Sequence, residues 1–518
     1  MTGLLVAGTT SDAGKSAVTT GLCRALSRRG TRVAPYKAQN MSNNSMVCLG
    51  SDGVAAEIGR AQWAQALAAG AVPEPAMNPV LLKPGTDRRS HVVLMGRPAG
   101  DVSSRDWASG RRHLAVAAHA AFDDLAARYD IVVAEGAGSP AEINLRDGDY
   151  VNMGLARHAS LPAIVVGDID RGGVFAAMLG TVALLSPEDQ ALIAGFVVNK
   201  FRGDSSLLAP GLAALSRLTG RTVYGVLPWD PGLWLDSEDA LDLAGRRARG
   251  SGAGVFRVAV MRLPRISNFT DVDALGLEPD LDVTFASSPR DIADADLVVL
   301  SGTRSTIGDL AWLRSRGLDG ALADHARRGR PLLGICGGFQ MLGSVIADPD
   351  GVEGDAGAVA EGLGLLGVRT DFGGDKTLGL PSGTGLGVPV SGYEIHHGRV
   401  AADGRAGSAG SAGSAGSAEE FPGGVRAGNV FGTMWHGALE GDEFRGAFLS
   451  AVFPGRAPSG VSFAAARERR LDLLGDLVEQ HLDVDALVAL ARAGAPAGLP
   501  VLPPAGGALA PANREGTT

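Results

Sequence analysis

The sequence predicts an α/β protein that contains two parallel-sheet domains in one chain. Short apolar runs end in glycine or polar residues, and helical patterns lie between them. Runs that are apolar throughout, rather than alternating, are typical of parallel strands covered by helices on both faces. The 518 residues, 45% of them hydrophobic, allow two or three domains with full-sized cores.

The apolar runs fall into two groups, separated by a polar and finally Gly/Ser-rich stretch at 236–254. We interpret this stretch as an interdomain linker. It separates an expected first domain at 1–235 from an expected second domain at 255–455. The first group of expected strands is 4–7, 131–134, 163–167, 195–199 and 223–227, with a helix after the first strand that runs to about Arg29. The second group is 256–262, 283–286, 297–300 and 331–335.

Three segments differ from these domains in composition. Residues 406–418 repeat Ala, Gly and Ser, so they have almost nothing to bury, and we expect a mobile surface loop. Residues 456–494 have a helical pattern. The Pro/Gly/Ala-rich stretch 495–518 is expected to be a disordered tail.

Charge and cysteine content exclude several classes of protein. The formal net charge is -9, from 47 Lys+Arg and 56 Asp+Glu, without a basic block, so nucleic acid is not an expected partner. Three cysteines argue against a disulfide framework and fit a reducing compartment. No uninterrupted apolar run reaches membrane-spanning length. We therefore expect a cytoplasmic protein without a membrane partner, and the sequence indicates no oligomeric state.

A glycine-rich loop follows the first expected strand and opens a helix, as in phosphate-binding loops. Its glycines would let backbone N–H groups turn toward phosphate oxygens at the helix N-terminus. A lysine there would neutralise phosphate charge, and the next hydroxyl would bind Mg²⁺. The spacing is one residue longer than in the common motif, and an ordinary strand–helix turn is the alternative interpretation. The candidate nucleotide-binding residues are Gly8, Thr9, Asp12, Gly14, Lys15 and Ser16.

A metal-bound triphosphate also needs an acidic residue at the end of another strand. Glu135 follows the run 131–134 and precedes a glycine-rich turn, so it is the preferred Mg²⁺ ligand together with Ser16. Asp52 is a second candidate in a polar loop. An exposed loop carboxylate is the alternative for Glu135, and no strand fixes the loop of Asp52.

A second glycine-rich turn places Cys336 between a strand and a helix, in a Gly-x-Cys-x-Gly arrangement. Small neighbours permit the sharp turn of a nucleophile elbow, and a helix N-terminus favours a thiolate. The alternative is an inert buried cysteine. Backbone N–H groups of Gly337 and Gly302 are candidate oxyanion donors, because Gly337 follows the sulfur and Gly302 ends the strand 297–300.

A cysteine nucleophile needs a base, which is usually histidine. His436 follows an apolar strand and precedes Gly437, while His396 and His397 compete for the role. Spacing alone does not choose between them.

Two resemblances cover most of the chain. The loop GTTSDAGKS at 8–16 resembles the dethiobiotin-synthetase-like P-loop family, and the elbow CGGFQMLG at 336–343 resembles class I glutamine amidotransferases, which have a flavodoxin-like α/β fold. The cobalamin-pathway amidotransferases fuse the two in this order. Further runs that resemble this family are YKAQNMSNNS at 36–45, EIGRAQ at 57–62, MNPVLLKP at 77–84, DIDRGGVF at 168–175 and GYEIH at 392–396.

The resemblance implies that Cys336 is the nucleophile and His436 its base. Class I glutaminases commonly carry Glu two residues after the histidine, where this chain has Ala438, and Glu440 is the nearest carboxylate. Residues 301–306 read SGTRST where the family usually has PGSKNT, and His397 stands where the family often has Met.

The resemblance further implies a ligase that uses ATP with Mg²⁺ and takes ammonia from glutamine. Its closest branch would amidate the b, d, e and g carboxylates of adenosylcobyrinic acid a,c-diamide. Another branch makes the a,c-diamide itself, and a P-loop partitioning or switch ATPase is the alternative from another class, which would need neither the elbow nor His436. Candidate contacts to the acidic corrinoid are Lys37, Gln39, Asn40, Lys83 and Arg171.

Overall fold

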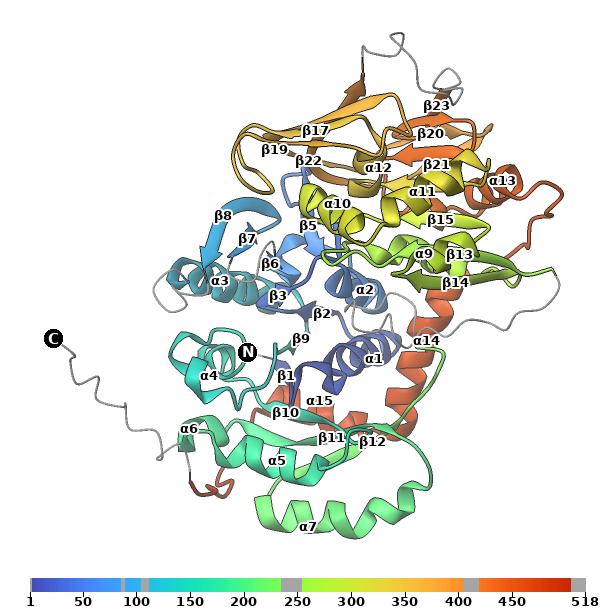
Figure 1. Ribbon diagram of the computed structural model, residues 1–518. Helices are drawn as coiled ribbons and strands as arrows, with labels where there is room; N and C mark the ends of the chain where they lie inside the picture. Colours follow the sequence, from blue (N-terminus) through green and yellow to red (C-terminus); the bar gives the residue numbers. More distant parts are fainter. Residues whose placement is uncertain (1, 85–88, 104–110, 234–253, 404–418, 505–518) are drawn as a thin grey trace.

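The structure is a computed structural model that describes residues 2–84, 89–103, 111–233, 254–403 and 419–504. The expected loop at 406–418 lies outside the described residues, as does the expected linker except for Gly254. Two α/β units are stacked, with the first half of the chain below and the second above (Figure 1). None of the described helices is long and apolar enough to cross a membrane.

The first unit is built on a six-stranded parallel sheet in the order β12-β11-β10-β1-β9-β2. Alternate side chains of β1 enter two separate hydrophobic cores. Leu5 and Ala7 belong to one core, and Leu4 and Val6 belong to the other, so both faces of the sheet are covered. The five strands expected here are all present. The strands are β1 (Gly3–Gly8), β2 (Val33–Tyr36), β9 (Ile131–Glu135), β10 (Ala163–Asp168), β11 (Ile193–Phe201) and β12 (Thr222–Pro228). The helices are α1 (Lys15–Arg28), α2 (Arg60–Ala68), α3 (Arg112–Arg128), α4 (Met153–Ala159), α5 (Val174–Ala183), α6 (Pro187–Gln190) and α7 (Ala209–Thr219).

Small strands cover the upper side of this unit, where it meets the second (Figure 1). A hairpin pairs β4 with β5, and a four-stranded sheet has the order β3-β6-β7-β8. The hairpin strands contact the second unit, β5 with β19 and β4 with β22. Their bounds are β3 (Gln39–Met41), β4 (Ser45–Leu49), β5 (Ala55–Gly59), β6 (Val80–Pro84), β7 (Arg89–Leu94) and β8 (Arg97–Ser103).

The second unit has a seven-stranded sheet in the order β14-β13-β15-β16-β25-β24-β23, parallel from β14 to β25. All four strands expected here are present. The sheet strands are β13 (Phe256–Met261), β14 (Leu281–Ala286), β15 (Leu297–Leu300), β16 (Leu332–Ile335), β23 (Glu419–Phe421), β24 (Gly424–Ala427) and β25 (Val430–Thr433). The helices are α8 (Asp273–Gly276), α9 (Pro289–Ala293), α10 (Thr306–Ser315), α11 (Leu318–Arg327), α12 (Gly337–Leu342) and α13 (Asp442–Val452).

A second layer of strands stands beside α12 in this unit. Four of them form the sheet β18-β17-β19-β22, and β20 pairs with β21. Their bounds are β17 (Val345–Asp348), β18 (Ala358–Glu361), β19 (Val368–Gly379), β20 (Ser382–Gly385), β21 (Val388–Ser391) and β22 (Glu394–Ala402).

The last two helices, α14 (Phe463–His481) and α15 (Val484–Ala493), return to the first unit (Figure 1). Helix α14 packs closely on α1, because Gly21 has no side chain: a Cβ there would lie 2.6 Å from the carbonyl oxygen of Leu474. Ion pairs along this contact join Arg24 and Arg28 to Asp472.

The segment 495–504 also packs on the first unit, contrary to the expected disorder from residue 495. Arg221 donates to the carbonyl of Pro500 at 2.9 Å, and Leu502 exchanges two hydrogen bonds with the buried side chain of Gln190. These hydrogen bonds from buried side chains hold a segment whose Pro/Gly/Ala-rich composition indicated disorder. Residues 505–518 lie outside the described residues.

Candidate active site

The phosphate loop between β1 and α1 has the conformation that its glycines predict. Gly14 has φ 95°, and a Cβ there would lie 1.9 Å from the side-chain nitrogen of Asn199, so any other residue would be strained and would displace Asn199. Lys15 folds over the loop and donates to the carbonyl oxygens of Thr10 at 2.9 Å and Gly138 at 3.0 Å. Its ammonium group thus lies at the loop, where a phosphate could take over these hydrogen bonds.

Glu135 ends β9 beside the phosphate loop and is fully buried. Its carboxylate accepts hydrogen bonds from Ser16 Oγ at 2.8 Å, Lys37 Nζ at 2.9 Å and Gln65 Nε2 at 2.6 Å. A hydroxyl and a carboxylate held together beside a phosphate loop are the oxygen ligands that Mg²⁺ takes in nucleotide sites. Lys37, which we expected to contact the corrinoid, belongs to this cluster.

Asp52 does not join this cluster, so its expected role as a metal ligand is wrong. It lies in the turn between β4 and β5, where its half-exposed carboxylate accepts from Arg97 at 2.8 Å and from the amide of Val54 at 3.0 Å.

Cys336 lies at a strained turn between β16 and α12, with φ 51° and ψ -111°. Positive φ is uncommon for a residue with a side chain and is often found at functional turns. The small neighbours are sterically required: a Cβ on Gly338 would lie 2.0 Å from the carbonyl oxygen of Leu300. This geometry is that of a nucleophile elbow.

His436 lies against Cys336, because it follows β25, the neighbour of β16 in the sheet. Its ring makes a side-chain hydrogen bond with Cys336 on one side, and its Nδ1 lies 2.7 Å from Oδ2 of Asp271 on the other. Burial alone would lower the pKa of His436, but the charges and hydrogen bonds of Asp271 and Cys336 raise it to about 10. A thiol, an imidazole and a carboxylate therefore form a chain of contacts, the arrangement of a nucleophile, its base and an orienting carboxylate.

Asp271 is the residue that sequence reasoning missed. It lies in the short helical turn Phe269–Val272, 165 positions before His436, and its other oxygen accepts from the amide of Gly437 at 2.8 Å. Glu440, the nearest carboxylate after His436 in the sequence, does not take this position. Its carboxylate is instead bound by Arg60 of the first unit at 2.7 Å and Arg467 of α14 at 2.9 Å.

The competing histidines, His396 and His397, line the pocket that Cys336 and His436 also line. The ring of His396 bonds to the carbonyl of Gly398 at 2.9 Å. Burial and the cations Lys376 and Arg304 lower the pKa of His397 to about 4. The contact between His436 and Cys336 therefore favours His436 as the base.

The two expected oxyanion donors lie beside Cys336 and His436. Gly337 is the first residue of α12, and a Cβ on it would lie 3.0 Å from the amide nitrogen of Thr303. A Cβ on Gly302 would lie 3.1 Å from Cε1 of His436. Both backbone segments thus lie against the Cys336 elbow, as an oxyanion hole requires.

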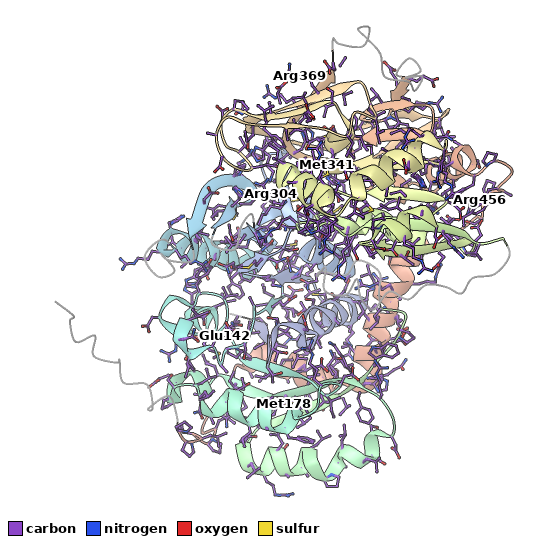
Figure 2. The ribbon with its side chains drawn as sticks, viewed as in Figure 1. Glu142, Met178, Arg304, Met341, Arg369 and Arg456 are labelled. Carbon is purple, nitrogen blue, oxygen red and sulfur yellow. The ribbon has the colours of Figure 1, made fainter. Side chains whose placement is uncertain are left out.

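A pocket next to Cys336 and His436 is formed by both units. Lys83 of β6 reaches it from the first unit, and Asn268 accepts a hydrogen bond from the amide of Ser45 at 2.9 Å across the same junction. Arg304 lies where the two units meet (Figure 2). The pocket is lined by Lys83, Ser267, Asn268, Thr303, Arg304, Cys336, Gln340, Glu353, Phe372, Lys376, Ile395, His396, His397 and His436.

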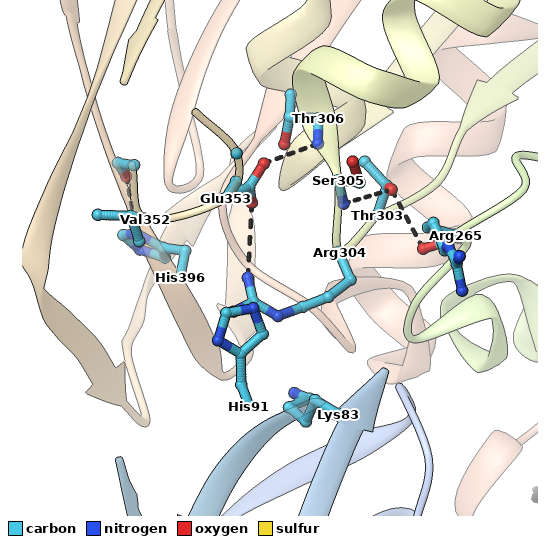
Figure 3. A network of polar contacts seen from close by, with 12 residues as sticks. Lys83, His91, Arg265, Thr303, Arg304, Ser305, Thr306, Val352, Glu353 and His396 are labelled. Carbon is cyan, nitrogen blue, oxygen red and sulfur yellow. Dashed lines mark hydrogen bonds and ion pairs between the residues drawn. The ribbon is translucent and has the colours of Figure 1, made fainter. Parts of the chain in front are cut away.

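Glu353 is the buried carboxylate of this pocket. The amide of Thr306 donates to it at 2.7 Å, and Arg304 lies 3.7 Å away (Figure 3). Burial, opposed by Arg304, raises the pKa of Glu353 to about 7.

The remaining corrinoid candidates are spread over the first unit. Gln39 accepts hydrogen bonds from Tyr150 at 2.5 Å and Arg111 at 3.4 Å. Asn40 donates to Gln62 at 3.0 Å. Arg171 is exposed and pairs with Asp12 of the phosphate loop at 3.0 Å, whereas Lys83 lies in the Cys336 pocket.

Comparisons with known proteins agree with the two-unit architecture. Residues 4–241 match the CobQ/CobB/MinD/ParA nucleotide binding domain, and residues 257–444 match the CobB/CobQ-like glutamine amidotransferase domain. A cobyric acid synthase from Mycolicibacterium gilvum is 74% identical over 97% of this chain and 99% of its own length. The cobyric acid synthase of Mycobacterium tuberculosis H37Rv is 73% identical over the same shares. A solved glutamine amidotransferase from Thermotoga maritima is 15% identical, with a TM-score of 0.25, over 46% of this chain and 99% of its own.

Proposed function

The chain belongs to the cobyric acid synthase family and is thus an ATP- and glutamine-dependent amidotransferase, from which we propose that it converts adenosylcobyrinic acid a,c-diamide into adenosylcobyric acid. The reaction would amidate the b, d, e and g carboxylates with ammonia from glutamine. The relatives are named for this reaction and not for a,c-diamide synthesis or partitioning, so neither alternative is favoured.

We propose that the second unit, residues 255–455, releases the ammonia. The sulfur of Cys336 attacks the glutamine carboxamide, and amide N–H groups of Gly302 and Gly337 stabilise the oxyanion. The protonated ring of His436, held by Asp271, gives a proton to the departing nitrogen. His436 then takes a proton from the water that cleaves the thioester and releases glutamate.

The first unit, residues 1–235 together with helices α14 and α15, would activate the corrinoid carboxylate. A free carboxylate is a poor electrophile, so the γ-phosphoryl group of ATP is transferred to it first, and ammonia then displaces phosphate. Lys15 would stabilise charge on the transferred group. Ser16 and Glu135 would hold Mg²⁺, which neutralises phosphate charge when bound, and Lys37 and Gln65 keep the Glu135 carboxylate in place.

The corrinoid is proposed to contact polar groups of the first unit. Gln39 and Asn40 are candidates, because they lie on β3 with their side chains fixed by hydrogen bonds. Arg171 is the exposed candidate, beside Asp12. Ammonium is not a nucleophile, so ammonia would have to travel between the units out of contact with water.

One observation carries the proposal: the Cys336–His436–Asp271 contact and the phosphate loop with Glu135 occur in one chain. The test is product analysis by mass spectrometry after incubation of the protein with the corrinoid diamide, ATP and glutamine. Four added amides are expected. Cys336→Ala should abolish the glutamine-dependent reaction and keep the ammonia-dependent one. Consumption of ATP without amidation would contradict the proposal.

A further inference from the structure

The pocket beside Cys336 contains more cations than anions. Among the described residues it is lined by Lys83, Arg304 and Lys376 and by one carboxylate, Glu353. Glu57 lies behind the two lysines and is the second anion. Three cationic side chains therefore lie near two carboxylates in this buried pocket. Such an excess is costly unless an anion from outside completes it.

The two lysines come from different units and share one partner. Lys83 of β6 and Lys376 of β19 both bond to the carboxylate of Glu57, whose side chain is fully buried. Ser45 Oγ donates to Glu57 at 2.7 Å and accepts from Lys83 at 2.9 Å, which fixes the group. Burial alone would raise the pKa of Glu57, but Lys376 and Lys83 lower it well below its usual value.

Lysine is rare in this chain, so two lysines in one pocket indicate a specific role for that pocket. The sequence has five lysines, at 15, 37, 83, 200 and 376, among 47 cationic residues. Lys15 and Lys37 lie at the phosphate loop and the Glu135 cluster, and two of the others line one pocket.

Two polar atoms in this pocket also point to a ligand. Nε2 of Gln340 and Nδ1 of His397 are buried and have no hydrogen-bond partner among the described residues. Buried polar atoms are nearly always paired in a folded protein, so a polar ligand is the expected partner.

We propose that Lys83 and Lys376, held in position by Glu57, bind the α-carboxylate of glutamine, so that the glutamine site is shared between the two units. The inference rests on the glutaminase activity proposed above. An α-amino acid fits this pocket better than a simple anion such as phosphate. Its carboxylate is complementary in charge to the two lysines. Its ammonium group is complementary in charge to the carboxylate of Glu353, which shares the pocket with Arg304 and Lys83 (Figure 3).

The shared site has a consequence for the reaction. Glutamine would bind fully only when the first unit is docked and Lys83 is in place. Hydrolysis of glutamine would then depend on the unit that consumes the ammonia.

The test compares two substrates of the full-length glutaminase: L-glutamine and L-glutamine α-amide, which has no charge at the α-carbonyl. Lys376→Met leaves Glu57 paired with Lys83, so the fold should survive. The substitution should raise the KM for glutamine roughly 10- to 100-fold, which corresponds to the loss of one charged hydrogen bond, with little change in kcat. The KM for the α-amide should stay the same. Lys83→Met should act in the same direction.

Two further variants serve as references. Arg369→Met removes a cation from the same strand, but Arg369 pairs with Asp371 at the surface and does not line the pocket, so both KM values should be those of the unaltered protein. Lys376→Arg keeps the charge and should keep most of the preference for glutamine. If Lys376→Met does not fold, Lys83→Gln and Lys83→Arg provide the same comparison.

The outcomes separate this inference from the proposed function. Equal losses for glutamine and its α-amide in the lysine variants would overturn the shared site while leaving the glutaminase intact. Absence of glutamine hydrolysis in the unaltered protein would instead overturn the proposed function.

Discussion

Nδ1 of His436 lies 2.7 Å from Oδ2 of Asp271, and the two residues are 165 positions apart in the chain. The proposed base is thus held by a carboxylate from the beginning of the second unit, rather than by one that follows the histidine closely. Because Glu440 is occupied by Arg60 and Arg467, the two carboxylates have separable roles.

Asp271→Asn should lower the kcat of glutamine hydrolysis about 100-fold or more, because the ring loses the partner that fixes its orientation and charge. Amidation with added ammonia should be unchanged. Steady-state assays with each nitrogen source measure the difference. Glu440→Gln is the matched control, and its glutaminase kcat should change far less. A larger effect from Glu440→Gln would assign the orienting role to that residue instead.

The pH dependence of glutamine hydrolysis should have an alkaline limb near pH 10. Asp271 and Cys336 raise the pKa of His436 to about 10 from an ordinary value of 6.5, so the ring stays protonated at neutral pH. The protonated form is needed to release ammonia, and it is lost as the pH rises through the folded value. The same ion pair stabilises the fold fully below pH 6.5 and ceases to do so above about 10.

Asp271→Asn should move this alkaline limb to lower pH, as measured by pH–rate profiles and by NMR titration of the ring. An unmoved limb in the variant would mean that Asp271 does not set the charge of His436.

Lys15→Met should abolish most of the ATP-dependent reaction and spare glutamine hydrolysis. Removal of one stabilising charge from a transition state typically costs roughly 100- to 1000-fold in kcat. Separate assays for phosphate and glutamate release measure the two activities. Arg202→Met is a reference, since Arg202 is half-exposed and pairs with Asp170 outside the phosphate loop. Full ATP-dependent activity in Lys15→Met would place the nucleotide elsewhere.

The contact between the units should weaken in acid. Lys376 and Lys83 hold the pKa of Glu57 well below its ordinary 4.5, so the carboxylate stabilises the fold above pH 4.5 and this contribution is lost progressively as the pH falls below that value. Calorimetry at a series of pH values measures the loss.

Glu57→Gln leaves two buried lysines without their anion and should cost about 3–5 kcal/mol at neutral pH. Its unfolding should also depend less on pH in the acid range. An acid dependence identical to that of the unaltered protein would show that another carboxylate controls the contact.

The sequence by itself determined the local parts of this protein. Nine strands, the phosphate loop with Gly14 and Lys15, and the turn at Cys336 were predictable, because each depends on neighbouring residues that fix a strand or a backbone turn. Among the strands that the sequence did not predict, β2 is short, contains Pro35 and lies at the edge of its sheet.

Only the tertiary structure decided which distant side chains meet. Asp271 reaches His436, Lys83 enters the pocket of Cys336, and α14 packs on α1, although these partners are far apart in sequence. Such contacts have no local pattern, because they follow from how strands are ordered and units are docked. A carboxylate near in sequence, such as Glu440, was therefore a poor guide to the one that is near in space.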